Sequence, residues 1–146
     1  MEELQNTDNV FFSFEGTSLD QFNEQKTREW ILNTIHTEGY QAGMIQVVFC
    51  DDEYVLEINR KYLNHNTYTD IITFNYNDEY EGIGGDIFIS LPRVKENAQQ
   101  FGIQFDEELH RVIIHGILHL LGYDDQDNTS TLEMRSKENY YLSLRT

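Results

Sequence analysis

The segment HGILHLLGYDDQ, residues 115–126, constrains this 146-residue chain more than any other stretch. His115 and His119 are four residues apart in a stretch with helical periodicity, so both imidazoles lie on one face of a helix, one turn apart. Gly122 predicts the end of this helix, because glycine readily adopts the left-handed conformation that follows a last helical turn. The pattern therefore predicts two imidazoles presented together just before the chain turns.

An acidic run follows the predicted helix end, and it can return a carboxylate to the two histidines. Two imidazole nitrogens, one carboxylate oxygen and an open position for water are typical of a hydrolytic zinc site. Asp125 is the expected third ligand, with Asp127 as the alternative. A competing interpretation is a buried or half-exposed histidine pair that binds no metal. We favour one zinc ion per chain, or another divalent transition metal, held by His115, His119 and Asp125.

The run from His115 to Asp125 closely resembles the signature of the YbeY family, His-Gly-x-x-His-Leu-x-Gly-Tyr-Asp-His. This resemblance implies a bacterial, metal-dependent endoribonuclease that is specific for single-stranded RNA. It also implies a role in ribosomal RNA maturation and in quality control of the small ribosomal subunit. The family signature ends in a third zinc-binding histidine, where this chain has Asp125. Carboxylate oxygen is an accepted zinc ligand, but it also suits harder ions such as manganese.

A second stretch, NRKYLNHNTYTDIITF at residues 59–74, resembles another element of the same family. It departs from the family pattern at Leu63, which replaces an arginine associated with RNA cleavage, and at Tyr68, which replaces a proline. The Gly-Asp-Ile element of the family matches residues 85–87. The resemblance and the proximity in sequence together indicate a set of substrate-binding residues: Asn59, Arg60, Lys61, His65, Asp70, Asp86 and Arg111.

Some of these residues also have a purely structural explanation. Asp70 and Asp86 fall at the starts of predicted strands, where aspartate often makes a turn. Arg111 lies on the same helical face as the first histidine of the motif and can contact a substrate phosphate. An ion pair with Glu107 or Glu108 along its own helix is the interpretation we favour for Arg111.

Gly116 separates this chain from metallopeptidases with the H-E-x-x-H motif, in which the residue after the first histidine is a glutamate general base. Glycine cannot accept a proton, and within a helix it costs about 1 kcal/mol relative to alanine. We therefore expect another segment or a substrate to approach the backbone closely at Gly116. No protein nucleophile is readable near the acidic loop, so water activated by the metal is the expected attacking group.

The chain is strongly acidic, with 10 basic and 26 acidic residues and a formal net charge of −16. Because RNA is a polyanion, binding it requires a local basic cluster, for which Arg60, Lys61 and Arg93 are candidates. The single cysteine, Cys50, follows an apolar run, so we expect it in the core, and one cysteine fits a reducing compartment. No leader sequence and no apolar run long enough to span a membrane are readable, which predicts a cytoplasmic protein.

The apolar pattern predicts an α+β fold with one domain over residues 1–146, a four-stranded mixed sheet, about five helices and a zincin-like metal-site helix. The first helix is expected to begin after Ser18 or Asp20, and the last helix to begin at Thr129 or Ser130. Period-two and β-branched segments predict strands at residues 10–14, 44–50, 67–76 and 85–90. Helical spacing predicts helices at residues 19–38, 51–63, 92–100, 106–121 and from 129 onward.

Three functions remain open at this point. The leading hypothesis is a metal-dependent endoribonuclease that acts on single-stranded ribosomal RNA and on the small ribosomal subunit. The alternatives are a non-catalytic ribosome-assembly factor with a structural metal and a metallopeptidase-like hydrolase, which Gly116 disfavours. The coordination of the metal separates them, because an open position favours catalysis and four protein ligands favour a structural site. The sequence does not indicate an oligomeric state.

Overall fold

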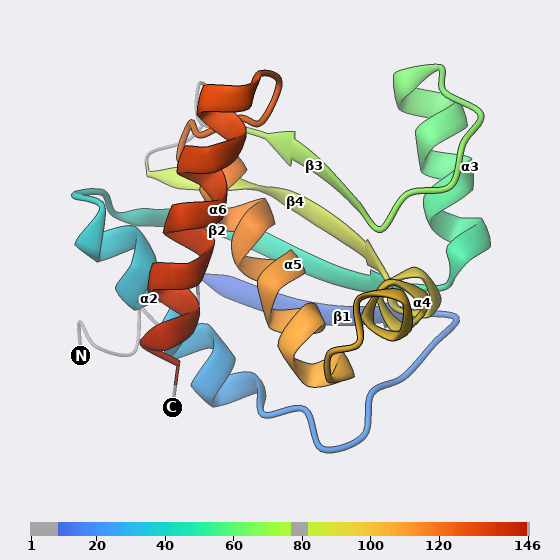
Figure 1. Cartoon of the computed structure of the whole chain (residues 1–146), viewed down its shortest axis with the longest axis horizontal. Helices are drawn as coiled ribbons and strands as arrows, with labels where there is room; N and C mark the ends of the chain where they lie inside the picture. The colour runs from blue at the N-terminus through green and yellow to red at the C-terminus, as the bar shows by residue number, and fades with distance from the viewer. Residues whose placement is uncertain (1–8, 77–81, 146) are drawn as a thin grey trace.

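A four-stranded mixed sheet forms the centre of the protein (Figure 1). The structure is a computed structural model that describes residues 9–76 and 82–145. The strand order is β1-β2-β4-β3, in which β1, β2 and β4 are parallel and β3 runs antiparallel to β4. This is the α+β fold with a mixed sheet that the sequence predicts. The strands are β1 (Val10–Glu15), β2 (Ala42–Cys50), β3 (Ile71–Asn75) and β4 (Ile83–Ser90).

Five helices cover the sheet within the described residues: α2 (Glu24–Thr37), α3 (Asp52–Leu63), α4 (Leu91–Phe101), α5 (Phe105–Leu120) and α6 (Asn128–Ser143). Helix α5 lies across the sheet, with α2 and α6 beside it (Figure 1). The two faces of the sheet have separate apolar clusters. Val47 and Ile87 pack in the large cluster with α2 and α5, whereas Val48 packs with Val55 of α3 on the other face. None of the helices in the described ranges is long and apolar enough to cross a membrane.

Helix α5 is the most buried helix of the described chain, with ten of its 16 residues in the core. Gly116 lies in the middle of that buried face. A Cβ atom at Gly116 would meet Ile71 Cδ1 at 2.9 Å and Ile87 Cγ2 at 3.0 Å, which is closer than side chains normally approach. The expectation of a close approach at this glycine is therefore confirmed, and the segment that approaches is the sheet.

The first helix begins later than the sequence predicts. It starts at Glu24 and is capped by Asn23, whose side chain accepts a hydrogen bond from the Lys26 backbone, so the expected caps at Ser18 and Asp20 are wrong. Phe22 explains the difference, because its ring packs at 5.2 Å from the ring of Phe49 in the core. Core packing of a non-helical segment has overridden the helical spacing of its apolar residues.

The starts of β3 and β4 also differ from the prediction. Strand β3 begins at Ile71 rather than at residue 67, and β4 begins at Ile83 rather than at residue 85. The Asn59 side chain donates a hydrogen bond to the Thr67 carbonyl at 2.8 Å, which ties the segment before β3 to helix α3. This segment therefore has β-like composition but a loop conformation.

Cys50 lies at the end of β2 and is fully buried, as expected for a core residue. Burial is the main cause that raises the pKa of its thiol, to about 12, and the nearby carboxylates add to the effect. At neutral pH the thiol therefore stays protonated and is a poor nucleophile. The structure agrees with the interpretation of Cys50 as core filler.

We expect Gly116→Val to destabilise the protein by about 2 kcal/mol, because the added carbons must enter the contact between α5 and the sheet. Urea unfolding followed by circular dichroism measures the loss. Ser136→Val is the matched control, since Ser136 is an exposed helical position on α6 that receives the same side chain. Equal midpoints for Gly116→Val and Ser136→Val would show that the close packing at Gly116 does not limit stability.

Candidate metal centre

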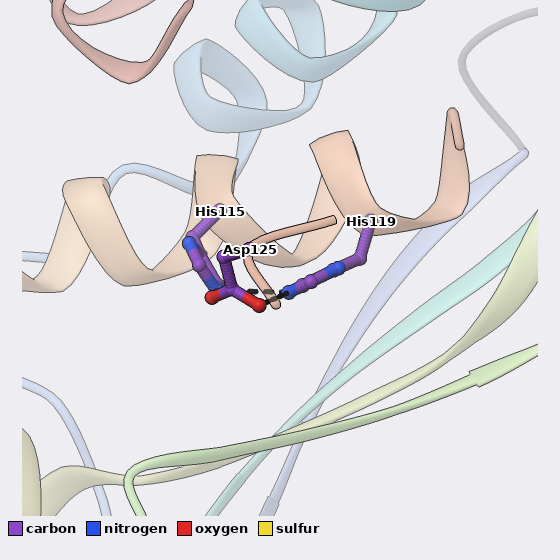
Figure 2. Close-up of side chains that lie close together, drawn as sticks. All are labelled: His115, His119 and Asp125. Carbon is purple, nitrogen blue, oxygen red and sulfur yellow. Dashed lines mark hydrogen bonds and ion pairs between the residues drawn. The ribbon is translucent and has the colours of Figure 1, made fainter. Parts of the chain in front are cut away.

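Three side chains near the end of α5 form one group of potential metal ligands (Figure 2). His115 and His119 come from the last two turns of α5, and Asp125 comes from the loop that follows. The two histidine Nε2 atoms are 3.0 Å apart. The Asp125 carboxylate lies 3.5 Å from the Nε2 atom of His115 and 3.9 Å from that of His119. The helical spacing has therefore brought together the three residues that the sequence singles out.

The second nitrogen of each imidazole has a hydrogen-bond acceptor beside it. His115 Nδ1 lies 2.7 Å from Glu138 Oε2, and His119 Nδ1 lies 3.0 Å from the Tyr123 carbonyl oxygen. Because both partners are acceptors, we assign a donated proton to each Nδ1 atom. In the neutral form this leaves a lone pair on each Nε2 atom, and the two lone pairs face each other. A cation between them would remove the repulsion. Acceptors on the second nitrogen, like these two, are typical of metal-binding histidines.

The surroundings give the two imidazoles different proton affinities. Burial acts to lower the pKa of His115, but the hydrogen bond and the charge of Glu138 outweigh it and raise that pKa above its usual value. Burial lowers the pKa of His119, and the positive charge of His115 lowers it further. Glu138 itself is buried, yet its bonds to His115 and Arg111 hold its pKa below the usual range. Glu138 is therefore ionised and orients the first histidine.

The loop that carries Asp125 is held at both ends by specific contacts. Gly122 has a positive φ of 106°, so it ends α5 in the left-handed conformation that the sequence predicts. Thr131 donates its hydroxyl to the Asp125 carbonyl at 3.0 Å. Asp127 is the N-cap of α6, where its carboxylate accepts a bond of 2.7 Å from the Ser130 backbone. Asp127 is therefore used as a helix cap, and Asp125 is the acid that reaches the histidines.

The arrangement fits a small divalent metal. Zinc binds histidine nitrogen at about 2.1 Å, which places two ligands of a tetrahedron about 3.4 Å apart, close to the separations in this group. Among the described residues, no fourth histidine, cysteine or carboxylate joins the three. The side of the group away from α5 is open, since 41% of the Asp125 side chain is exposed. Three protein ligands with an accessible position are typical of a catalytic site rather than a structural one.

Two of the predicted substrate-binding residues lie beside this group. Asp70, just before β3, and Arg111, one turn before His115, line the same cavity of about 230 Å³ as His115 and Asp125. Arg111 forms an ion pair, as favoured, but its partner is Glu138 of α6 at 3.0 Å and not Glu107 or Glu108. The reason is tertiary, because the packing of α6 against α5 places the buried Glu138 carboxylate within reach of the Arg111 guanidinium.

The predicted substrate-binding residues on α3 and just after it lie away from the group. Figure 1 shows helix α3, which carries Arg60 and Lys61, at the far end of the sheet from the end of α5 and the loop after it. Arg60 binds the side chain of Asn66, and Lys61 lies over the Tyr62 ring. Asn59 is buried with a backbone partner, and His65 is exposed in the loop that follows α3.

Asp86 and Arg93 also have partners within the fold. Asp86 lies inside β4 rather than at its start, and its carboxylate accepts a hydrogen bond of 3.0 Å from the Tyr76 hydroxyl. Arg93 forms an ion pair of 2.6 Å with Asp52. The basic cluster expected from Arg60, Lys61 and Arg93 is therefore dispersed into separate ion pairs and ring contacts. The substrate roles of these residues stay predictions.

Sequence reasoning missed two residues of α6 at this site. Glu138 orients His115, and Arg135 lies 3.5 Å from Glu138 and lines the cavity beside the metal ligands. One signal for Glu138 is readable in the sequence, because it falls between Met134 and Tyr141 on the buried face of α6. A carboxylate at a core position of a helix indicates a buried charge partner or a ligand.

Comparison with known proteins agrees with this arrangement. The family model described as endoribonuclease YbeY matches residues 12–145. The chain belongs to the YbeY family. A relative from Bacteroides thetaiotaomicron, named endoribonuclease YbeY, is 46% identical over 136 residues, which are 93% of this chain and 98% of the relative. Another of the same name, from Flavobacterium psychrophilum, is 51% identical over 115 residues, or 79% of this chain and 81% of the relative.

The fold is also found among solved structures. A solution structure of a protein from Thermotoga maritima matches with a TM-score of 0.65 and 27% sequence identity. The match covers 90% of this chain and 87% of that protein. The family assignment inferred from the histidine motif and the α+β fold are therefore both confirmed.

We expect Asp125→Ala to weaken zinc binding by more than about tenfold, since even outer-shell changes at zinc sites cost roughly that much. Asp127→Ala should leave zinc affinity unchanged but cost about 1 kcal/mol of stability, because it removes a helix cap. Competitive zinc titration and urea unfolding of both variants provide the two measurements. The reverse pattern, with weak zinc binding only in Asp127→Ala, would make Asp127 the third ligand.

Proposed function

We propose that this protein is a metal-dependent endoribonuclease that cleaves single-stranded RNA, and that zinc is its metal. The observation that carries the proposal is the group of three ligands with an open side at the end of α5. Membership of a family whose curated relatives are named endoribonucleases supports the reaction. We further propose ribosomal RNA of the small subunit as the substrate, which would place the action of the protein in the cytoplasm.

The residues of the chain have distinct parts in this proposal. His115, His119 and Asp125 would hold the metal, and Glu138 and the Tyr123 carbonyl orient the two imidazoles through their Nδ1 atoms. When bound, a divalent metal polarises a phosphoryl oxygen and makes a water molecule more acidic. Gly116 offers no carboxylate to take a proton from that water. We propose that water attacks the phosphate and that no protein side chain acts as the nucleophile.

Two arginines are placed to hold a substrate phosphate near the metal. Arg111 and Arg135 line the same cavity as His115 and Asp125. The Arg135 side chain is 60% exposed, so it can turn toward a ligand at little cost. Guanidinium groups bind phosphate through paired hydrogen bonds. The family pattern has an arginine where this chain has Leu63. We propose that Arg135, together with Arg111, supplies the phosphate contact of that missing arginine.

The two alternative functions have less support. A ribosome-assembly factor with a structural metal calls for four protein ligands, whereas the described residues supply three. A metallopeptidase of the H-E-x-x-H type requires a glutamate where this chain has Gly116 packed against the sheet. A side chain at that position would also have to displace Ile71 and Ile87, whose methyl carbons lie 2.9 Å and 3.0 Å from where its Cβ atom would be. Endonucleolytic cleavage of RNA is therefore the function we favour.

We expect His119→Ala to abolish metal-dependent cleavage of single-stranded RNA, because two of the three ligands do not hold the metal in place. Gel analysis of a labelled unstructured RNA, with and without added zinc or manganese, measures the loss. His36→Ala is the matched control, since His36 is an exposed histidine on α2. If the native protein cleaves no RNA with any divalent metal, the assembly-factor alternative replaces this proposal.

We expect Arg135→Ala to weaken RNA binding and to reduce the slope of log affinity against log salt by about one, because one phosphate contact is lost. Fluorescence anisotropy with a single-stranded RNA in chelator measures binding without cleavage. Arg60→Ala serves as the comparison, because Arg60 lies on α3 away from the metal ligands. A loss of affinity in Arg60→Ala alone would move the phosphate path to α3.

A further inference from the structure

The cavity beside the metal ligands has a side that the proposed cleavage chemistry does not use. This side lies between α4, the N-terminal half of α5 and the residue before β3, and it is lined by Phe101, Glu108 and Asp70. The whole cavity measures about 230 Å³, slightly less than pockets that enclose drug-sized ligands. Its size suits one small planar group next to the reaction site.

Glu108 is the unusual residue of this cavity. Glu108 is only 5% exposed, and its Oε1 atom has no hydrogen-bond partner among the described residues. Arg111, three residues further along α5, donates to Glu138 instead. Buried acceptors in folded proteins are nearly always satisfied. The unpartnered carboxyl group therefore points to a donor that comes from outside the chain.

The electrostatic surroundings of Glu108 support the same conclusion. Burial raises the pKa of the Glu108 carboxyl, and the charge of Asp70 raises it further. Burial likewise raises the pKa of Asp70, whose carboxylate receives a long hydrogen bond of 3.4 Å from the Asn97 side chain. Two carboxyl groups with raised pKa values thus line one small cavity. A ligand that presents N–H groups would stabilise both.

An exposed aromatic ring lies at the same cavity. Phe101, the last residue of α4, is 63% exposed, although it is a large apolar side chain. Proteins that bind single-stranded nucleic acid commonly stack bases on such rings. The cavity thus offers an aromatic ring and two acceptor groups beside the candidate metal ligands. These features suit an unpaired base whose hydrogen-bonding edge carries donors.

We propose that this cavity is a base-binding subsite in which Glu108 accepts hydrogen bonds from a guanine next to the cleaved phosphate. Guanine presents two adjacent donors, N1–H and the N2 amino group, on its Watson–Crick edge. Adenine and cytosine present one amino group there, and uracil presents one N–H. The inference rests on the proposed endoribonuclease function, and it assigns to that function a preference for guanine.

The test compares short oligouridines that carry one central guanine, hypoxanthine or uracil. Hypoxanthine lacks the N2 amino group and keeps the rest of the guanine ring. Binding is measured by fluorescence anisotropy with chelator present, and cleavage is measured separately with added metal. We expect the native protein to bind the guanine oligomer about fivefold or more tightly than the other two, the lower end of the range for one specific base contact.

Glu108→Gln keeps the shape of the side chain but replaces one acceptor oxygen with a donor, so it should abolish the difference between guanine and hypoxanthine. Glu107→Gln, at the exposed neighbouring position, should retain that difference. Equal binding of all three oligomers by the native protein, or an unchanged preference in Glu108→Gln, would overturn the inference and leave water as the partner of Glu108. A guanine preference in binding without any cleavage would instead refute only the endoribonuclease function.

Discussion

The close packing of α5 on the sheet at Gly116 is the contact on which the rest of the structure depends. Without a side chain at this position, the helix approaches Ile87 of β4 and Ile71 of β3 directly. That approach buries the apolar face of α5 and brings His115 and His119 beside the edge strand β3, next to the loop that returns Asp125. The same glycine stands where the H-E-x-x-H peptidases have their glutamate base. One residue therefore allows the close packing and also argues against peptidase chemistry.

A buried charge network then joins α5 to α6. Glu138 accepts hydrogen bonds from Arg111 and from Nδ1–H of His115, so one carboxylate connects α5 to α6. An unpaired charge at this depth would be strongly unfavourable, and breaking such a pair typically costs about 3–5 kcal/mol. Orientation of the metal ligand and stability of the helix pair are therefore coupled through a single side chain.

The acidity of the chain means that a cation at the candidate metal site would also attract RNA. A formal net charge of −16 repels RNA over most of the surface, so attraction has to be local. The cavity that His115 and Asp125 line also contains two arginines, beside a group of ligands suited to a divalent cation. Positive charge is thus concentrated where the phosphate is proposed to bind, while the carboxyl groups on the other side of the cavity face the base.

Local sequence determined the parts of this protein that depend on neighbours along the chain. The i and i+4 spacing of His115 and His119, the helix end at Gly122 and the four strands follow from periodicity and from glycine conformation, and all are found in the structure. The start of the first helix at Glu24 was decided instead by Phe22, whose ring is more stable in the core than on a helix. The spacing of apolar residues along the chain does not show which of these two positions of the ring is more stable.

Only the tertiary structure decided which side chains meet across the site. Glu138 lies 23 residues from His115, and Glu108 faces a cavity shared with α4 and α6. The sequence pairs Arg111 with a glutamate of its own helix, yet Glu138 of α6 takes it, and Glu108 of α5, although equally buried, keeps an oxygen without a hydrogen-bond partner among the described residues. The choice between Asp125 and Asp127 was made in the same way, since the start of α6 uses Asp127 as its cap and leaves Asp125 to the histidines.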